Sequence, residues 1–261
     1  MSLQGKKVLV VGTGKSGIAA TELLRANNID TVLFDGNKEL DTEALYEKVP
    51  AIREVPLILG DMTDAQMDEF DVAVLSPGVP TDIPMVNSLR DKGVKIWGEI
   101  ELAYTFGAGR IIAITGTNGK TTTTALTGEI MKNYFKDVRV VGNIGIPYTS
   151  MVTGSTDETV TVAEISSFQL ETIDTFKPHI SAILNITPDH LNRHHTMENY
   201  IRAKEDITKN QTKDDFCILN YEDKVLRGFA AECSAKVVFF SSKSELSEGF
   251  YLNGDIIMYA H

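Results

Sequence analysis

The fold is decided by the stretch IIAITGTNGKTT, residues 111–122. Consecutive apolar residues are typical of a strand covered on both faces of a parallel α/β sheet. The glycines that follow let backbone N–H groups surround phosphate oxygens at the start of a helix. In that setting Lys120 would neutralise phosphate charge, and the hydroxyl of Thr121 would bind Mg²⁺. The stretch therefore predicts a strand, a phosphate loop and a helix in succession.

The same alternation runs along the whole chain. Further short apolar runs predict strands at 8–11, 32–34, 72–75, 160–163 and 183–184, and helices are expected over 16–26, 84–92 and 120–135. Leu126, Ile130 and Tyr134 form an apolar stripe on the third of these helices. We expect a doubly wound α/β architecture. A Rossmann-like parallel-sheet domain is predicted over residues 1–98, and a P-loop-type α/β domain that is incomplete over 99–261.

Composition narrows the class of protein. The 261 residues carry 25 Lys and Arg against 36 Asp and Glu, a net charge of −11, and 43% are apolar. This acidic balance gives no basic surface for nucleic acid or an anionic membrane, and no apolar run is long enough to span a bilayer. Cys217 and Cys233 show no CxxC spacing, which favours two structural thiols in a reducing cytoplasm.

Ligands of open α/β sheets bind beyond the carboxyl ends of the strands. The first strand is followed by Gly12–Gly17 (GTGKSG), a GxGxxG pattern, and Asp35 ends the next strand. In a dinucleotide enzyme that acid would hold a ribose hydroxyl, so a nucleotide-type ligand is expected, with a purely structural turn as the alternative. Ser76-Pro77-Gly78 follows the strand predicted over 72–75, where it either presents backbone N–H groups to a ligand or forms a plain turn.

Three residues of the second domain are candidates for metal chemistry. Glu164 ends a strand beside the phosphate loop and is either a Mg²⁺ ligand or a helix-capping acid. His190 follows another strand and is a metal ligand, a polar contact or a structural residue. Lys204 lies on the apolar face of a helix predicted over 197–210, where it either extends to water or is held near the site with altered chemistry. The neighbouring His194 and His195 are expected in an exposed loop.

Taken together, four segments resemble the Mur ligase family: Gly116–Thr121, Glu164–Glu171 (EISSFQLE), Asn185–His190 (NITPDH) and Tyr200–Lys204. The EISSFQLE segment resembles the branch that adds D-glutamate to UDP-N-acetylmuramoyl-L-alanine. The resemblance implies an ATP-dependent amide-bond ligase of peptidoglycan precursor synthesis, cytoplasmic and monomeric. Its reaction would proceed through an acyl phosphate. It also implies a third, C-terminal domain that this chain lacks, so we expect these residues to bind the UDP substrate without completing ligation.

The resemblance also implies roles for individual residues. ATP phosphates would contact Gly116, Thr117, Asn118, Gly119, Lys120, Thr121 and Thr122. Thr121 and Glu164 would hold a first Mg²⁺, and His190 with a carbamylated Lys204 a second. The UDP substrate would contact Gly14, Lys15, Ser16, Asp35, Gly36, Ser76, Pro77, Gly78, Asn143, Ser166 and His190. The family often has threonine where this chain has Gly36.

Other readings of the same residues stay open. The GxGxxG pattern and Asp35 favour an NAD-binding Rossmann module fused to an accessory NTP-binding domain, although such a module has no need of a triphosphate site. A P-loop kinase or switch ATPase explains Lys120 and Thr121 but leaves the first domain without a purpose. A sibling Mur ligase or a folylpolyglutamate-type ligase is the nearest enzymatic alternative.

Overall fold

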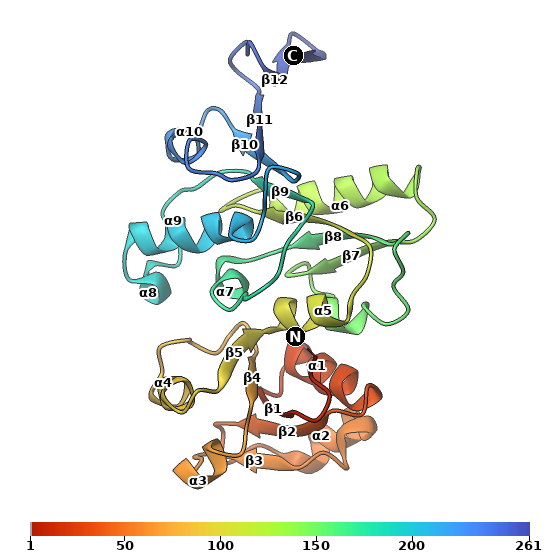
Figure 1. Cartoon of the computed structure of the whole chain (residues 1–261), viewed down its shortest axis with the longest axis vertical. Coiled ribbons are helices and arrows are strands. Elements are labelled where there is room, and N and C mark those ends of the chain that lie inside the picture. Colours follow the sequence, from red (N-terminus) through yellow and green to blue (C-terminus); the bar gives the residue numbers. More distant parts are fainter. Residues whose placement is uncertain (1) are drawn as a thin grey trace. The chain divides into compact units, whose positions relative to one another are not determined.

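Parallel strands alternate with helices, and the computed structural model, which describes residues 2–261, arranges them in two sheets (Figure 1). Two compact units result. The first holds the chain up to Gly107 together with two later segments, Ile146–Gly154 and Glu171–Asp174. The second holds Ala108–Gly145, Ser155–Leu170 and Thr175–His261. The predicted α/β class is confirmed, and none of the described helices is long and apolar enough to cross a membrane.

The first unit contains a five-stranded parallel sheet of order β3-β2-β1-β4-β5. Its strands are β1 (Lys7–Val11), β2 (Asp30–Asp35), β3 (Leu57–Leu59), β4 (Val72–Leu75) and β5 (Lys95–Gly98). Its helices are α1 (Lys15–Ala26), α2 (Thr42–Lys48), α3 (Asp64–Met67), α4 (Pro84–Asp91) and α5 (Glu99–Phe106). The order of the strands reverses at β1, which lies between β2 and β4. In sheets of this kind, ligands bind beyond the carboxyl ends of the strands at such a reversal.

The second unit contains an eight-stranded sheet of order β13-β12-β11-β10-β9-β6-β8-β7. Its strands are β6 (Arg110–Thr115), β7 (Val138–Gly142), β8 (Val160–Glu164), β9 (Ile180–Ile183), β10 (Phe216–Asn220), β11 (Lys236–Ser241), β12 (Gly249–Asn253) and β13 (Ile256–Ala260). Its helices are α6 (Lys120–Lys132), α7 (Ser167–Leu170), α8 (Leu191–His194), α9 (Met197–Glu205) and α10 (Lys224–Phe229). Only the β12–β13 pair is antiparallel. The carboxyl ends of β6, β8 and β9 therefore lie side by side.

Helix α6 corrects one prediction from the sequence. The apolar stripe of Leu126, Ile130 and Tyr134 does not face the core, because these side chains are 59%, 45% and 77% exposed. The buried face carries Thr124 and Gly128 instead. A Cβ added at Gly128 would lie 2.4 Å from Val140 Cγ2 in β7. The helix packs closely on the sheet through small residues, so hydrophobicity alone predicts the wrong face.

The two later segments of the first unit are held to α5 and its neighbours by hydrogen bonds. Thr149 donates to Glu99 Oε1 from its backbone N–H and its hydroxyl. Asp174 N–H donates to Glu101 Oε2 over 2.8 Å. Burial raises the pKa of Glu99, although the hydrogen bonds from Thr149 oppose that rise. Two buried carboxyl groups of one short helix thus anchor segments that are distant in the sequence.

Candidate functional site

The phosphate loop predicted from the sequence connects β6 to α6. Gly116 and Gly119 have φ angles of +147° and +84°, conformations that a residue with a side chain rarely adopts. Lys120 folds back over the loop, and its Nζ donates to Gly116 O and Thr117 O, both at 2.9 Å. Because α6 begins at Lys120, the free backbone N–H groups of its first turn lie next to this lysine and the loop. The loop can therefore surround a polyphosphate.

A segment after β9 supports this loop. Asn185 O accepts from Thr117 N–H, Asn185 Oδ1 accepts from Asn118 N–H, and Asn185 Nδ2 donates to Asn118 O. Thr187 N–H donates to the Thr117 hydroxyl over 3.0 Å. The sequence analysis quoted Asn185 within NITPDH but assigned it no role. Only the pairing of β9 with β6 places it against the loop.

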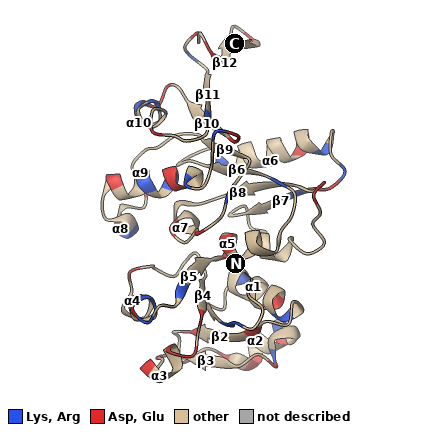
Figure 2. Cartoon of the chain, in the orientation of Figure 1, with Lys and Arg blue, Asp and Glu red and all other residues tan. Residues whose placement is uncertain are grey.

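Lys204 reaches the same loop from α9. Its Nζ donates to Gly116 O over 2.8 Å, and the residue is 2% exposed. The side chain is thus buried and does not extend to water, which decides between the two readings left open by the sequence. Burial, and secondarily the charge of Lys120, lower the pKa of Lys204 to about 7, while Asp189 acts in the opposite direction. Basic and acidic residues lie together along α9 (Figure 2).

Tyr200 secures α9 to the loop one turn before Lys204. Its hydroxyl lies 3.0 Å from the Thr117 hydroxyl, and the residue is 1% exposed. Lys204 Nζ lies 4.8 Å from the centre of the Tyr200 ring. Helical spacing predicted Lys204 on the apolar face of this helix, and the structure places it on the same buried face as Tyr200.

Glu164 ends β8, where it pairs in register with Ile114 just before the loop. It is 1% exposed. Its Oε1 accepts from Asn143 Nδ2 over 2.7 Å, whereas Oε2 has no hydrogen-bond partner among the described residues. A buried carboxylate oxygen without a partner is costly unless a ligand completes it. Across residues 2–261 there is no cluster of three His, Cys, Asp or Glu residues suited to holding a metal ion.

The remaining predicted residues of this unit lie around Phe168. The His190 ring centre lies 4.9 Å from that of Phe168, and its backbone has a positive φ of 51°. Ser166 is bonded to Gln169, whose Oε1 accepts from the Ser166 N–H and hydroxyl. His194 corrects the expectation of an exposed loop, because it is buried and its Nε2 lies 2.9 Å from Ser167 Oγ. Stacking on Phe168 explains this burial, which the polar sequence did not indicate.

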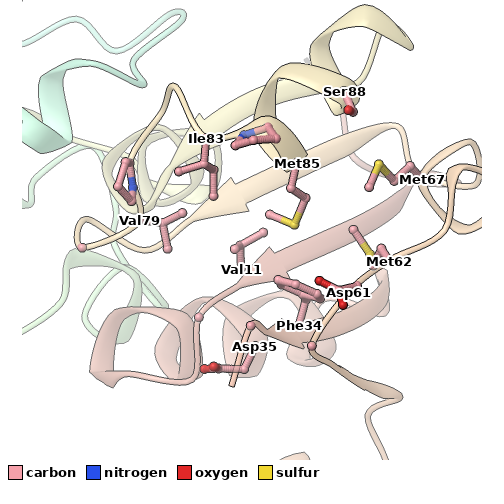
Figure 3. Close-up of a pocket in the computed structure, with 16 residues that line it drawn as sticks. Val11, Phe34, Asp35, Asp61, Met62, Met67, Val79, Ile83, Met85 and Ser88 are labelled. Carbon is pink, nitrogen blue, oxygen red and sulfur yellow. The ribbon is translucent and has the colours of Figure 1, made fainter. Parts of the chain in front are cut away.

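The first unit holds a separate pocket of about 610 Å³ (Figure 3). Apolar side chains line it together with Asp35 and Asp61. Gly12, Gly36 and Gly78 also line it and place no side chain in it. Figure 3 shows Val11, Phe34 and Met85 gathered at the pocket, with Asp35 and Asp61 on one side of them. Of the residues predicted to contact a UDP group, Asp35, Gly36 and Gly78 line this pocket, whereas Gly14, Lys15, Ser16, Ser76 and Pro77 are not among its lining residues.

The loop Gly12–Gly17 is hydrogen-bonded to the carboxylate of Asp35 at the end of β2. Asp35 Oδ2 accepts from Thr13 N–H at 3.1 Å and from the Thr13 hydroxyl at 2.6 Å, and Oδ1 accepts from Asn37 N–H. Burial by itself raises the pKa of Asp35, but these hydrogen bonds outweigh it and lower the pKa. Ser76 Oγ is buried beside Gly12 and has no partner among the described residues. The two hydrogen bonds from Thr13 thus hold the loop against the end of β2.

Comparison with protein families gives two matches. The Mur ligase MurD-like N-terminal domain matches residues 6–98, and the Mur ligase middle domain matches residues 114–258. UDP-N-acetylmuramoylalanine–D-glutamate ligases are similar at 58% identity in Lachnoclostridium phytofermentans, 54% in Lachnospira eligens and 47% in Clostridioides difficile. Each alignment covers 99% of this chain. The chain spans about 57% of the length of these relatives.

Solved structures show the same fold at low identity. UDP-N-acetylmuramate-alanine ligase MurC of Thermotoga maritima aligns over 95% of this chain and 54% of its own, with a TM-score of 0.55 and 24% identity. The UDP-N-acetylmuramate:L-alanyl-gamma-D-glutamyl-meso-diaminopimelate ligase of Neisseria meningitides covers 97% of this chain and 84% of its own. Its TM-score is 0.60 at 14% identity.

Proposed function

The chain belongs to the Mur ligase family, and we propose that it carries the substrate and ATP sites of the ligase that joins D-glutamate to UDP-N-acetylmuramoyl-L-alanine. Relatives at 47–58% identity bear that activity in their names. Since the chain spans only part of their length, the residues that bind D-glutamate need not be among these 261.

The observation that carries the proposal is the convergence of two lysines on one loop. Lys120 and Lys204 both donate to Gly116 O, at 2.9 and 2.8 Å. Two ammonium groups this close repel each other, which contributes to the lowered pKa of Lys204. Such a cluster suits a polyanion, so we place the ATP phosphates on Gly116–Thr122, with Lys120 against their charge.

The same loop suits Mg²⁺. Thr121 and Glu164 would hold one ion, and the unpartnered Oε2 of Glu164 fits that role because Mg²⁺ takes one or two carboxylates and completes its shell with phosphates and water. His190 and Lys204 would hold a second. Bound Mg²⁺ would reduce the repulsion between the substrate carboxylate and the ATP phosphates.

Lys204 suits this second position only after modification. A buried lysine with a pKa of about 7 is largely the neutral amine at slightly alkaline pH. The amine nitrogen can then attack CO₂ and release a proton, which converts a cationic side chain into an anionic carbamate. The carbamate supplies the hard oxygen ligand that an ammonium group cannot.

In the proposed reaction the L-alanine carboxylate of the UDP substrate attacks the γ-phosphate of ATP, the bond to the β–γ bridging oxygen breaks, and ADP leaves as the acyl phosphate forms. The amine of D-glutamate then displaces phosphate and forms the amide. Lys120 and the N-terminal N–H groups of α6 offset the negative charge that accumulates as two anions approach. Asn185 and Tyr200 hold the loop in place during this approach through their bonds to Thr117.

The pocket of the first unit would receive the uridine end of the substrate. Its apolar lining fits a flat base, and the N-terminus of α1, which follows the Gly12–Gly17 loop, would supply backbone N–H groups for the diphosphate. Asp35 stays ionised because Thr13 and Asn37 donate to it, so it offers an acceptor to a ligand hydroxyl or N–H group.

Calorimetric titration of this chain with UDP-N-acetylmuramoyl-L-alanine and, separately, with NADH tests the proposal. We expect the first compound to bind and NADH not to bind. Gly36→Tyr should weaken binding at least about tenfold, because it fills the pocket at a position where an added Cβ meets nothing within 4 Å. Gly228→Tyr on the exposed face of α10 is the matched control. Binding of NADH, or unchanged affinity of the Gly36→Tyr variant, would contradict the assignment.

A further inference from the structure

The segment that follows β9 runs in direct contact with the phosphate loop. Leu184 N–H donates to Thr115 O over 3.0 Å, just past the paired ends of β6 and β9. A Cβ added at Gly116 would lie 3.0 Å from Leu184 Cβ and 3.4 Å from Asn185 N. The approach therefore depends on glycine at position 116. It places Asn185 against the turn of the loop.

Asn185 pairs with the backbone of one loop residue through both ends of its side-chain amide. Its Oδ1 accepts from Asn118 N–H over 2.8 Å, and its Nδ2 donates to Asn118 O over 3.0 Å. The backbone O of Asn185 also accepts from Thr117 N–H over 2.9 Å. Three hydrogen bonds from one residue thus fix two successive residues of the loop.

Asn185 is itself held on both sides by the neighbouring strand and helix. Asn220, at the end of β10, donates from Nδ2 to Leu184 O over 3.0 Å. Asp223, the N-cap of α10, accepts from Ile186 N–H at Oδ2 over 2.7 Å. The residues before and after Asn185 are therefore fixed to the sheet, so its amide meets the loop from a supported backbone.

These bonds divide the N–H groups of the loop into two sets. The N–H groups of Thr117 and Asn118 donate to Asn185. Gly119 is the N-cap of α6 and makes no side-chain cap hydrogen bond. The N–H groups at the start of a helix also have no carbonyl to donate to within that helix. The donors that remain for a phosphate are therefore the N–H groups of residues 119–122.

We propose that Asn185 is a positioning residue of the ATP site, an inference that rests on the proposed function. It fixes Thr117 and Asn118, so that residues 119–122 present their N–H groups to the phosphates. A ligand that binds a preformed loop does not have to order it, and the affinity is higher for that reason. Since both amide groups of Asn185 are used on Asn118, the residue acts on ATP through the loop alone.

Amide hydrogen exchange of this chain, followed by NMR, is the first test and needs no nucleotide. The N–H groups of Thr117 and Asn118 should exchange slowly, and those of residues 119–122 at the rates of exposed amides. Asn185→Ala should speed the exchange of Asn118 about tenfold, because its N–H group loses its acceptor. Equal exchange rates at Asn118 and Gly119 in the native chain would overturn the proposal.

Steady-state kinetics of the full-length ligase is the second test. Asn185→Ala should raise the KM for ATP about tenfold and leave the KM for the UDP substrate unchanged. Asn185→Asp keeps the shape and one acceptor but turns an oxygen toward Asn118 O. Its KM for ATP should rise further, because a negative charge then lies beside the phosphate loop. A native KM for ATP in Asn185→Asp would show that position 185 only fills space.

Asn133→Ala is the matched control and should keep the native KM for ATP. Asn133 lies exposed at the far end of α6, and its Nδ2 donates to Glu129 O of the same helix. If neither Asn185 variant folds, the exchange pattern of the native chain decides. If the native ligase forms no amide with ATP, the proposed function fails and this inference falls with it. If it does form the amide and Asn185→Ala keeps the native KM for ATP, this inference alone is wrong.

Discussion

The two glycine-rich loops of this molecule look alike in sequence and differ in what surrounds them. Gly12–Gly17 and Gly116–Thr121 each follow a buried strand and precede a helix. The first loop is closed by a carboxylate, because Asp35 accepts two hydrogen bonds from Thr13. The second is covered by two lysine side chains, because Lys120 and Lys204 both donate to Gly116 O. Similar backbone turns are therefore bordered by side chains of opposite charge type, a carboxylate at the first loop and lysines at the second.

The partners also come from different distances along the chain. Thr13 and Asp35 are separated by 22 residues, which hold one helix and the next strand, whereas Gly116 and Lys204 are separated by 88. A glycine pattern establishes that backbone can approach a ligand closely. The charged side chains beside that ligand come from other elements at the same edge of the sheet. These elements can be far apart in sequence.

The largest effect is expected at the lysine that distinguishes the second loop. Lys204→Arg keeps a positive charge but cannot form a carbamate. In the full-length ligase, turnover should fall by roughly 10²–10³-fold, the range found when one charge-stabilising group is removed from a site. Lys209→Arg, on the exposed surface just after α9, should leave turnover unchanged. If Lys204→Arg turned over at the wild-type rate, a carbamate on Lys204 would not be needed for the reaction.

The second prediction tests which glycine of the first loop is needed for close packing. A Cβ at Gly17 would lie 1.8 Å from Gly12 O, whereas a Cβ at Gly14 would meet nothing within 4 Å. Gly17→Ala should lower the free energy of unfolding by about 3 kcal/mol, and Gly14→Ala should stay within about 0.5 kcal/mol of the native chain. Fluorescence of Trp97, the single tryptophan and buried in the first unit, reports the urea transition. Equal stability of the two variants would contradict the close packing.

The third prediction concerns the change of stability with pH, which is small for each pH unit, and it depends on Lys204 alone. Lys204 has a pKa of about 7 when folded and 10.5 when exposed, so between these values the unfolded chain binds more protons. The free energy of unfolding should therefore rise with pH from 7 toward 10.5, by at most on the order of 1 kcal/mol per pH unit relative to Lys204→Met. Below pH 7 the difference between the two proteins should be constant.

Thermal or urea unfolding followed by circular dichroism, in buffer freed of CO₂, measures this slope. Lys209→Met is the control and should parallel the native chain at every pH. A difference between the native chain and Lys204→Met that does not change with pH would show that Lys204 titrates normally and is not desolvated.

Much of the fold followed from local pattern. Runs such as Val8–Val11 and Val72–Leu75 are buried strands because consecutive apolar residues suit a sheet covered on both faces. The phosphate loop was recognisable because its glycines and lysine are adjacent in sequence. The stripe on α6 was misread, since a helix with Gly128 at its contact packs by close approach and not by apolar area.

The sequence by itself determined the α/β class, the positions of both glycine-rich loops and the residue types available at the strand ends, because these depend on neighbours within a few residues. Only the tertiary structure decided that Lys204 is buried against Gly116 and that His194 stacks on Phe168. Those contacts join residues from separate elements. They are set by strand order and by the crossing of helices over the sheet, which no local periodicity encodes.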